Sequence, residues 1–364
     1  MNRVFRRTSF LLLSVLSFAF ISMTGCIDGL NGQPQPTNTS SDLPAVTDLV
    51  QNRMNRDRFQ GAVVLVRRNN RVIYQKAFGN YTTDTVVPIA SASKWLSASV
   101  IMTLVDSGKL SLDAPISKYL PNFTGKKGTI TLRQLLSHTS GLPGNHRCLA
   151  NQSITLAECV DQIAQVELQS DPGTQFRYGG VSFQVAGRIA EVVSGKSWNQ
   201  LFEEKIKIPL NMANTSYGNT RNPRIAGGAS STAQDYANLL QMHLNDGLFN
   251  GKRVLSATSV EEMQRDQTRG VPIAFTPLGD NRRYGLGEWR DLIDSKGRAI
   301  QLSSPGAFGF TPWIDEQRKL VGIFLVRNRL RNVTPTVEDL QKQLRELVDQ
   351  RRATVDTPEV SSAS

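Results

Sequence analysis

The chain has 364 residues, of which 39% are hydrophobic and 20% charged, and its formal net charge is +11 at pH 7. This length allows one large two-lobed domain or two small ones. The basic residues are scattered rather than grouped in a stripe with interleaved aromatic residues, so the positive charge does not predict a nucleic-acid partner.

Residues 1–25 have the pattern of a secretory signal peptide. Three arginines precede the apolar run 10–23, which is short for a membrane-spanning helix, and a small-residue processing site follows directly. Residues 23–26, Met-Thr-Gly-Cys, resemble the bacterial lipobox, which implies cleavage before Cys26 and a lipid on its thiol. Without the three arginines the net charge falls from +11 to +8.

The lipobox resemblance predicts a lipid-anchored protein of the bacterial cell envelope that faces the periplasm, and Ile27 favours the outer membrane if the host is Gram-negative. An ordinary secreted protein whose signal ends near a cysteine is the alternative. Residues 26–45, rich in Gly, Pro, Thr, Asn and Ser, are predicted to form a flexible tether. A folded domain is expected over residues 46–351, followed by a disordered tail at 352–364.

Apolar periodicity outlines the elements of this domain in chain order. A first amphipathic helix is predicted from Val46 to Met54, and the β-rich segments 59–66 and 71–78 predict a hairpin that turns at 68–71. Further helices are expected at about 155–168, 181–194 and 232–247, then a buried strand at 320–326 and a closing amphipathic helix around 337–348. The layout is α+β: an antiparallel sheet formed by both chain ends and flanked by helices, with a mostly helical lobe between them.

Ser91 and Lys94 open an apolar helix that ends near Ser107-Gly108. Residues three apart lie on one helical face, so the Lys94 amine can reach the Ser91 hydroxyl. Burial lowers the pKa of an amine, which lets Lys94 accept the serine proton at neutral pH, and the unpaired N–H groups of the helix start suit an oxyanion. A Ser-x-x-Lys pattern arises by chance about once in such a chain, so other segments must support the assignment.

With the segments that follow it, the Ser91–Lys94 motif resembles the serine β-lactamase and penicillin-binding-protein superfamily, nearest the class C β-lactamases and related esterases. The similarity covers about residues 45–350 and includes 108–113, 119–121 and 130–143, of which the last is the most specific. It implies a β-lactamase/transpeptidase-like fold in which Ser91 is the nucleophile and Lys94 its base.

The resemblance also implies the remaining site residues. Residues 172–180 are similar to the family's second catalytic element, which places the catalytic tyrosine at Tyr178, where its phenol can share the proton relay with Lys94. Gly180 stands where the family commonly has a substrate-binding amide or hydroxyl.

The family's third motif aligns with Ser304-Pro305-Gly306, and Ser304 replaces its cation. Gly306 and Ala307 would let a strand edge approach the substrate, and the amides of Ser91 and Ala307 would form the oxyanion hole. Because the missing charge normally meets a carboxylate, the change at Ser304 favours a neutral ester or amide substrate.

The other polar residues give no second catalytic motif. The chain lacks a Gly-x-Ser-x-Gly elbow, and His138 is interpreted as a hydrogen-bonding loop residue. Residues 227–236 are interpreted as a structural glycine turn before a helix N-cap. The loops 218–226 and 269–284 are expected to border the cleft. In the second loop, Arg269, Arg282 and Arg283 are interpreted as solvated surface, with attraction of acidic substrates as the alternative.

If Cys26 carries a lipid, Cys148 and Cys159 remain as a pair in an oxidising compartment, eleven residues apart. They form either a disulfide or two free thiols. His138, His146 and Cys148 lack a fourth ligand at a zinc-site spacing, so no metal site is predicted, and no organic cofactor is implied.

We therefore expect a serine hydrolase that forms an acyl-enzyme with an ester or amide. A true β-lactamase or a D-Ala-D-Ala carboxypeptidase is the alternative within the superfamily, so the partner is a small ester or amide, a β-lactam or a cell-wall peptide. A non-catalytic envelope-binding lipoprotein that kept the fold is the alternative from another class, favoured by the changes at Gly180 and Ser304. The sequence predicts no oligomeric state.

Overall fold

The computed structural model describes residues 43–279 and 282–355, with side chains described up to residue 350. The predicted signal peptide, the predicted lipidation site Cys26, most of the predicted tether and residues 356–364 lie outside the described residues.

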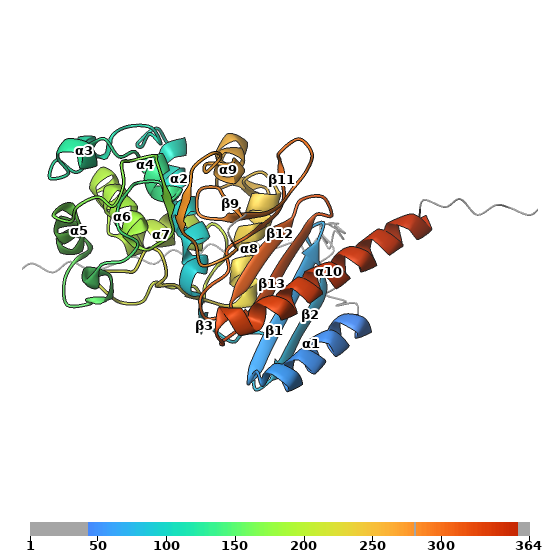
Figure 1. Cartoon of the computed structure of the whole chain (residues 1–364). Coiled ribbons are helices and arrows are strands. Elements are labelled where there is room, and N and C mark those ends of the chain that lie inside the picture. Colours follow the sequence, from blue (N-terminus) through green and yellow to red (C-terminus); the bar gives the residue numbers. More distant parts are fainter. Residues whose placement is uncertain (1–42, 280–281, 356–364) are drawn as a thin grey trace, which may run out of the picture. The chain divides into compact units, whose positions relative to one another are not determined.

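A seven-stranded antiparallel sheet, built by strands from both chain ends, organises the described part of the chain (Figure 1). The strand order is β2-β1-β13-β12-β11-β10-β9. These strands are β1 (Gly61–Arg68), β2 (Arg71–Gly79), β9 (Arg283–Tyr284), β10 (Trp289–Ile293), β11 (Ala299–Ser303), β12 (Thr311–Asp315) and β13 (Leu320–Val326). β13 pairs with β1 on one side and β12 on the other, which explains its continuous apolar run. The predicted α+β fold and the predicted strand at 320–326 are confirmed.

β1 and β2 form the predicted hairpin. The backbone conformation of the hairpin turn explains why two asparagines occupy it. Asn69 and Asn70 have φ angles of 49° and 66°, the left-handed conformation that tight hairpin turns require and that asparagine tolerates. β1 is buried along its length because it has a neighbour on each side, whereas β2 lies at the sheet edge and buries only Tyr74 and Phe78.

The helices α1 (Pro44–Asp57) and α10 (Leu330–Val355) pack on one face of the sheet (Figure 1). α1 begins two residues inside the predicted tether, because proline fits the first turn of a helix. α10 continues four residues into the predicted tail. Val348 is the last buried residue among the side chains that are described, and Arg351, Arg352 and Ala353 beyond it have high intrinsic helix propensity.

The opposite face of the sheet packs against α2 (Ser93–Asp106) and the predicted helical lobe. Almost every α2 residue is buried, which accounts for the lack of a polar face in its sequence. The other helices are α3 (Gly125–Gly128), α4 (Leu132–Leu136), α5 (Leu156–Ala164), α6 (Val181–Ser194), α7 (Trp198–Phe202), α8 (Ala233–Leu244) and α9 (Ala257–Gln264). Three short strand pairs accompany them: β3 (Val87–Pro88) with β5 (Ser230–Ser231), β4 (Phe176–Arg177) with β8 (Ile273–Phe275), and β6 (Leu248–Phe249) with β7 (Lys252–Arg253).

The helix predicted at 155–168 is shorter in the structure. Thr155 caps α5 in a reciprocal capping box with Glu158, so the start agrees with the prediction. The helix ends at Ala164, because the following chain turns away to pair with another loop, where the amide of Gln169 donates to the carbonyl of Gly141 at 2.8 Å.

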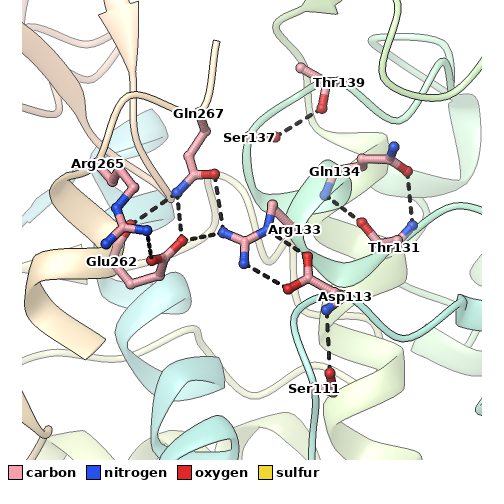
Figure 2. A network of polar contacts seen from close by, with 10 residues as sticks. All are labelled: Ser111, Asp113, Thr131, Arg133, Gln134, Ser137, Thr139, Glu262, Arg265 and Gln267. Carbon is pink, nitrogen blue, oxygen red and sulfur yellow. Dashed lines mark hydrogen bonds and ion pairs between the residues drawn. The ribbon is translucent and has the colours of Figure 1, made fainter. Parts of the chain in front are cut away.

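The family-specific segment 130–143 connects distant parts of the chain through Arg133 (Figure 2). Its guanidinium binds Asp113 in a bidentate manner, with distances of 2.6 and 2.8 Å, and also donates to Glu262 and, at 3.2 Å, to Gln267. Fork-shaped pairs of this kind fix orientation as well as charge. Arg133 therefore ties α4 to the loop after α2 and to α9, which gives this segment a structural role.

Candidate active site

Ser91 lies in a tight 3₁₀ turn, Ala90–Ala92, immediately before α2, and Lys94 is in the first turn of that helix. Ala90 has φ 46°, a left-handed conformation that costs a residue with a side chain about 1–3 kcal/mol and persists only because the surrounding packing holds it. Nζ of Lys94 donates a hydrogen bond of 3.2 Å to Oγ of Ser91. The structure thus brings the two sequence-predicted residues together.

Lys94 is buried among groups that solvate an ammonium poorly. Its side chain lies over the Tyr178 ring, with Nζ 4.5 Å from the ring centroid, and Nζ donates to the carbonyl of Ala226 at 3.0 Å. No carboxylate in the described residues forms an ion pair with it. Burial, and to a lesser extent the positive charge of Arg224, lowers the pKa of Lys94 to about 7. At neutral pH a large fraction of Lys94 is therefore an uncharged amine that can accept a proton.

Tyr178 follows β4, and its amide donates to the carbonyl of Phe275 at 3.1 Å. Its ring stacks on Trp289 with centroids 5.3 Å apart and is 8% exposed. Burial raises the pKa of the phenol, and hydrogen bonding to Ser91 and Trp289 opposes this effect only in part. The phenol is therefore protonated at neutral pH, which suits it to donate a proton next to Ser91.

His138 was interpreted from sequence as a hydrogen-bonding loop residue, which holds for its backbone, since its carbonyl accepts from the amide of Arg177 at 2.9 Å, but is wrong for its side chain. Both of its ring nitrogens are buried without a partner among the described residues. The imidazole instead packs among aromatic rings, with its centroid 4.6 Å from that of Tyr178 and 5.2 Å from that of Phe183. Burial, assisted by the charge of Lys94, holds the pKa of His138 well below its usual value, so the ring is neutral.

Gly180 is the N-cap of α6, and its amide donates to the carbonyl of Gly144 at 2.7 Å. A Cβ at this position would lie 3.0 Å from Cδ1 of Leu149 and 3.8 Å from Cβ of Ala226. Leu149 thus occupies the space into which a larger side chain would extend. The packing around Gly180 therefore leaves no room for the larger side chain that the family commonly has at this position.

Cys148 and Cys159 form a disulfide whose Cα atoms are 5.1 Å apart. It links the short 3₁₀ turn Arg147–Ala150 to α5. The amide group of Asn222 also donates to the carbonyl of Cys148 at 2.8 Å. These contacts hold Leu149, the next residue, against Gly180.

The third motif lies beside the nucleophile, in the turn between β11 and β12 rather than on the predicted strand edge. The Ser304 hydroxyl donates to the carbonyls of Ser91 at 3.4 Å and Gly287 at 3.3 Å. A Cβ at Gly306 would lie 2.2 Å from the carbonyl oxygen of Ile89, so only glycine permits this approach. The chain leaves the sheet here because Gly306 and Phe310 close a tight turn, in which the amide of Gly306 donates to the carbonyl of Phe310 at 2.8 Å.

Two backbone amides next to this contact are available to bind an anion. Among the described residues, neither the amide of Ser91 nor that of Ala307 donates a hydrogen bond. Ala307 is exposed and follows Gly306, which packs against the residue pair Ile89–Ala90 just before Ser91. Unpaired amides at the site of a developing oxyanion provide electrostatic stabilisation.

Residues 224–229 overlap the loop 218–226 that was expected to border the cleft, but their bonds to the nucleophile helix were not predicted. This segment is bonded to α2 at three points: Ser97 Oγ to the carbonyl of Ile225 at 2.7 Å, Lys94 to Ala226, and the amide of Ala229 to Ser93 Oγ at 3.0 Å. The predicted N-cap nearby is confirmed, because the Thr232 side chain accepts from the amide of Asp235. The glycine pair at 227–228 was the only sequence signal of this close approach.

An Arg224→Gln variant is expected to raise the pKa of Lys94 above about 7. Arg224 is exposed, and its side chain forms no ion pair or hydrogen bond in the described part of the chain, so the substitution removes a charge near Lys94 without breaking a contact. Most of the depression will remain, since burial is its larger cause. NMR titration of labelled lysine measures the change, with Arg221→Gln in the same loop as the control. A pKa that stays constant or falls in Arg224→Gln would contradict the assignment.

No group of three metal-ligating side chains occurs in residues 43–279 and 282–355. In the same part of the chain, no helix combines the length and apolar character needed to cross a bilayer.

The sequence model of the beta-lactamase family matches residues 46–345, which is most of the chain. The chain belongs to the beta-lactamase family. This confirms the superfamily resemblance and the β-lactamase/transpeptidase-like fold expected from the motifs at Ser91 and at 130–143.

The chain is similar in sequence to curated proteins and in structure to solved proteins. Penicillin-binding protein 4 of Amycolatopsis lactamdurans is 31% identical over 245 residues, or 57% of this chain and 64% of that protein. The chain thus spans less than two thirds of the length of the curated relatives that it matches first. A candidate beta-lactamase from Bacteroides dorei DSM 17855 is 34% identical, with a TM-score of 0.76 over 83% of this chain and 98% of that one. EstCE1, a hydrolase with promiscuous acyltransferase activity, shares the fold, with a TM-score of 0.69 at 22% identity over 81% of this chain and 97% of its own.

Proposed function

We propose that this beta-lactamase-family protein is a serine hydrolase that forms an acyl-enzyme at Ser91 with an ester or amide substrate. The observation that carries the proposal is the buried amine of Lys94, 3.2 Å from the Ser91 hydroxyl, with its pKa lowered to about 7. A serine hydroxyl is a weak nucleophile until a neighbouring base removes its proton. Lys94 meets both the geometric and the electrostatic requirement for that base.

In the acylation step, Ser91 Oγ forms a bond to the substrate carbonyl carbon as its proton passes to Nζ of Lys94. The carbonyl oxygen becomes an oxyanion, which the free amides of Ser91 and Ala307 stabilise. When the bond to the leaving group breaks, the proton passes from Lys94 through the Tyr178 phenol to the departing oxygen or nitrogen. In deacylation, water adds to the acyl carbon with the same two groups as base and acid, and Ser91 is regenerated.

The substrate side of the site supports a neutral ester or amide, because Ser304 stands where a cation would meet a carboxylate. Gly180 presents no side chain, and the hydroxyl of Ser304 is already engaged with two backbone carbonyls. The similarity to penicillin-binding protein 4 favours a second candidate, a β-lactam or a D-Ala-D-Ala peptide. Rates measured side by side on a nitrophenyl ester, a chromogenic cephalosporin and a D-Ala-D-Ala peptide will separate the two. If the specificity constant is highest for the cephalosporin or for the D-Ala-D-Ala peptide, the second candidate replaces the first.

Labelling with a fluorescent fluorophosphonate tests the nucleophile. The wild type is expected to be labelled at Ser91, and the Ser91→Ala variant is expected to take up no label because the attacking oxygen is gone. Ser93→Ala is the matched control: Ser93 is buried two residues further on, where its hydroxyl accepts from the amide of Ala229, and the variant should retain the label. Equal labelling of wild type and Ser91→Ala would refute the assignment. Ser91-dependent turnover of any substrate would exclude the non-catalytic binding protein.

A further inference from the structure

A groove with a volume of about 1310 Å³ lies away from Ser91, at the end of the sheet next to α9. It is formed by the C-terminal end of α9, the loop after it, and the turns that connect β10 to β11 and β12 to β13. Small-molecule pockets usually measure about 300–1,000 Å³, so this groove is large for a single small ligand. Its size points to an extended ligand.

The groove carries an excess of positive charge. Seven of its lining residues are arginine or lysine and four are acidic. Each acidic residue of the lining forms an ion pair with a basic residue of the lining. The pairs are Asp294 with Arg298, Glu316 with Lys319, Asp266 with Arg290 and Glu261 with Arg265. The cations that these pairs leave over are Arg269, Arg283 and Lys296.

The side chains of Arg269 and Lys296 form no hydrogen bond or ion pair with any residue that the structure describes. Arg283 makes one long hydrogen bond, to the carbonyl of Thr268 at 3.3 Å. These three cations come from the loop after α9, from β9 and from the β10–β11 turn, so they lie on different elements around one groove. Cations spread in this way are suited to a ligand with several negative charges.

Arg290 adds a buried cation to the groove lining. Its side chain is 4% exposed, lies 3.4 Å from Asp266 and donates to the carbonyl of Gly297 at 2.6 Å. Its Nε has no partner among the described residues. Its guanidinium therefore adds positive charge to the wall of the groove, part of which Asp266 offsets.

The lining also limits the chemistry of the ligand. It contains no Phe, Tyr, Trp or His side chain in the described residues, so it offers no surface on which nucleic-acid bases would stack. We propose that this groove binds a flexible linear polyanion that carries repeated phosphate or carboxylate groups and no aromatic bases. The site is separate from the proposed hydrolytic site and does not depend on Ser91.

The proposal is tested with two fluorescein-labelled probes, inorganic polyphosphate and polygalacturonate, by fluorescence anisotropy on the full chain. A double variant, Arg269→Gln with Lys296→Gln, is expected to bind the preferred polymer at least about tenfold more weakly at low salt. Its plot of log affinity against log salt should be less steep by about 2, one for each lost cation. The two polymers distinguish phosphate from carboxylate as the recognised group.

The matched control is Arg331→Gln with Lys342→Gln, which removes the same charge from exposed positions on α10 outside the groove. This control should bind like the wild type, and Ser91→Ala should do so as well. An equal loss in both double variants would show a response to net charge alone and overturn the proposal. Failure of both polymers to bind at low salt would also overturn it, and tighter binding of oligo-dT than of either polymer would overturn the choice of ligand. None of these outcomes bears on the hydrolase proposal, because the binding assay needs no turnover.

Discussion

A Lys94→Gln variant is expected to hydrolyse a nitrophenyl ester with kcat/KM about a thousandfold below that of the wild type, within the range known for loss of a general base. Glutamine keeps most of the side-chain length but has no basic nitrogen to accept the proton of Ser91 Oγ. In the wild type, kcat/KM should rise with pH through about 7, where Lys94 loses its proton. The variant should lack this rise, so steady-state kinetics across pH measures both effects.

Lys109→Gln provides a control, because Lys109 is an exposed lysine just beyond the end of α2. Its kinetics should match those of the wild type. The melting temperature of Lys94→Gln is expected not to fall, since the substitution removes a cation that is buried without a carboxylate partner. An activity within tenfold of wild type, or an unchanged pH profile in Lys94→Gln, would rule out Lys94 as the base.

The fold was predictable where apolar spacing alone decides an element. The continuous apolar run of the central strand β13 and the β-rich residues of the edge strand β2 both appear directly in the sequence. The ends of elements were less predictable. α5 ends early because Gln169 bonds to Gly141, which is distant in sequence. The third motif leaves the sheet in the turn that Gly306 and Phe310 close, and this turn brings Gly306 against Ile89, another residue distant in sequence.

The same division applies to the site. The contact between Ser91 and Lys94 follows from helical spacing, so the sequence alone could suggest it. The carbonyl of Ala226, the charge of Arg224 and the ring of Trp289 reach the site through tertiary packing, which leaves no local pattern. His138 shows the opposite error for its side chain: a polar residue in a loop suggested hydrogen bonds, whereas the structure surrounds its imidazole with aromatic rings.

The departures from the family pattern at Gly180 and Ser304 have structural explanations that differ. At Gly180 the space is taken by Leu149, which the disulfide at Cys148 holds in place, so the missing side chain is replaced by an apolar wall. At Ser304 the hydroxyl bonds to the carbonyl of Ser91, so the residue supports the nucleophile turn. Both changes remove side-chain groups that the family commonly uses to bind substrate, whereas the hydrogen bond between Lys94 and Ser91 remains.

A Tyr178→Phe variant is expected to lower kcat/KM for the same ester by about a hundredfold, the lower part of the range for loss of a general acid. Burial holds the pKa of Tyr178 above its usual value of 10.0, so the phenol is a proton donor at neutral pH. Phenylalanine removes that donor and keeps the ring that stacks on Trp289 and packs against His138. The melting temperature should therefore change little.

Tyr284→Phe is the matched control for this prediction. Tyr284 belongs to the same aromatic cluster, with its ring centroid 6.0 Å from that of Tyr178, and its hydroxyl is buried without a partner among the described residues. Removing that hydroxyl should leave kcat/KM within about twofold of wild type, because it takes no part in the proton relay. If the two tyrosine variants lose activity equally, the effect comes from packing in the cluster and not from proton donation by Tyr178. Each substitution removes one hydroxyl oxygen from the same aromatic cluster. A loss confined to Tyr178→Phe therefore identifies the Tyr178 phenol as the proton donor.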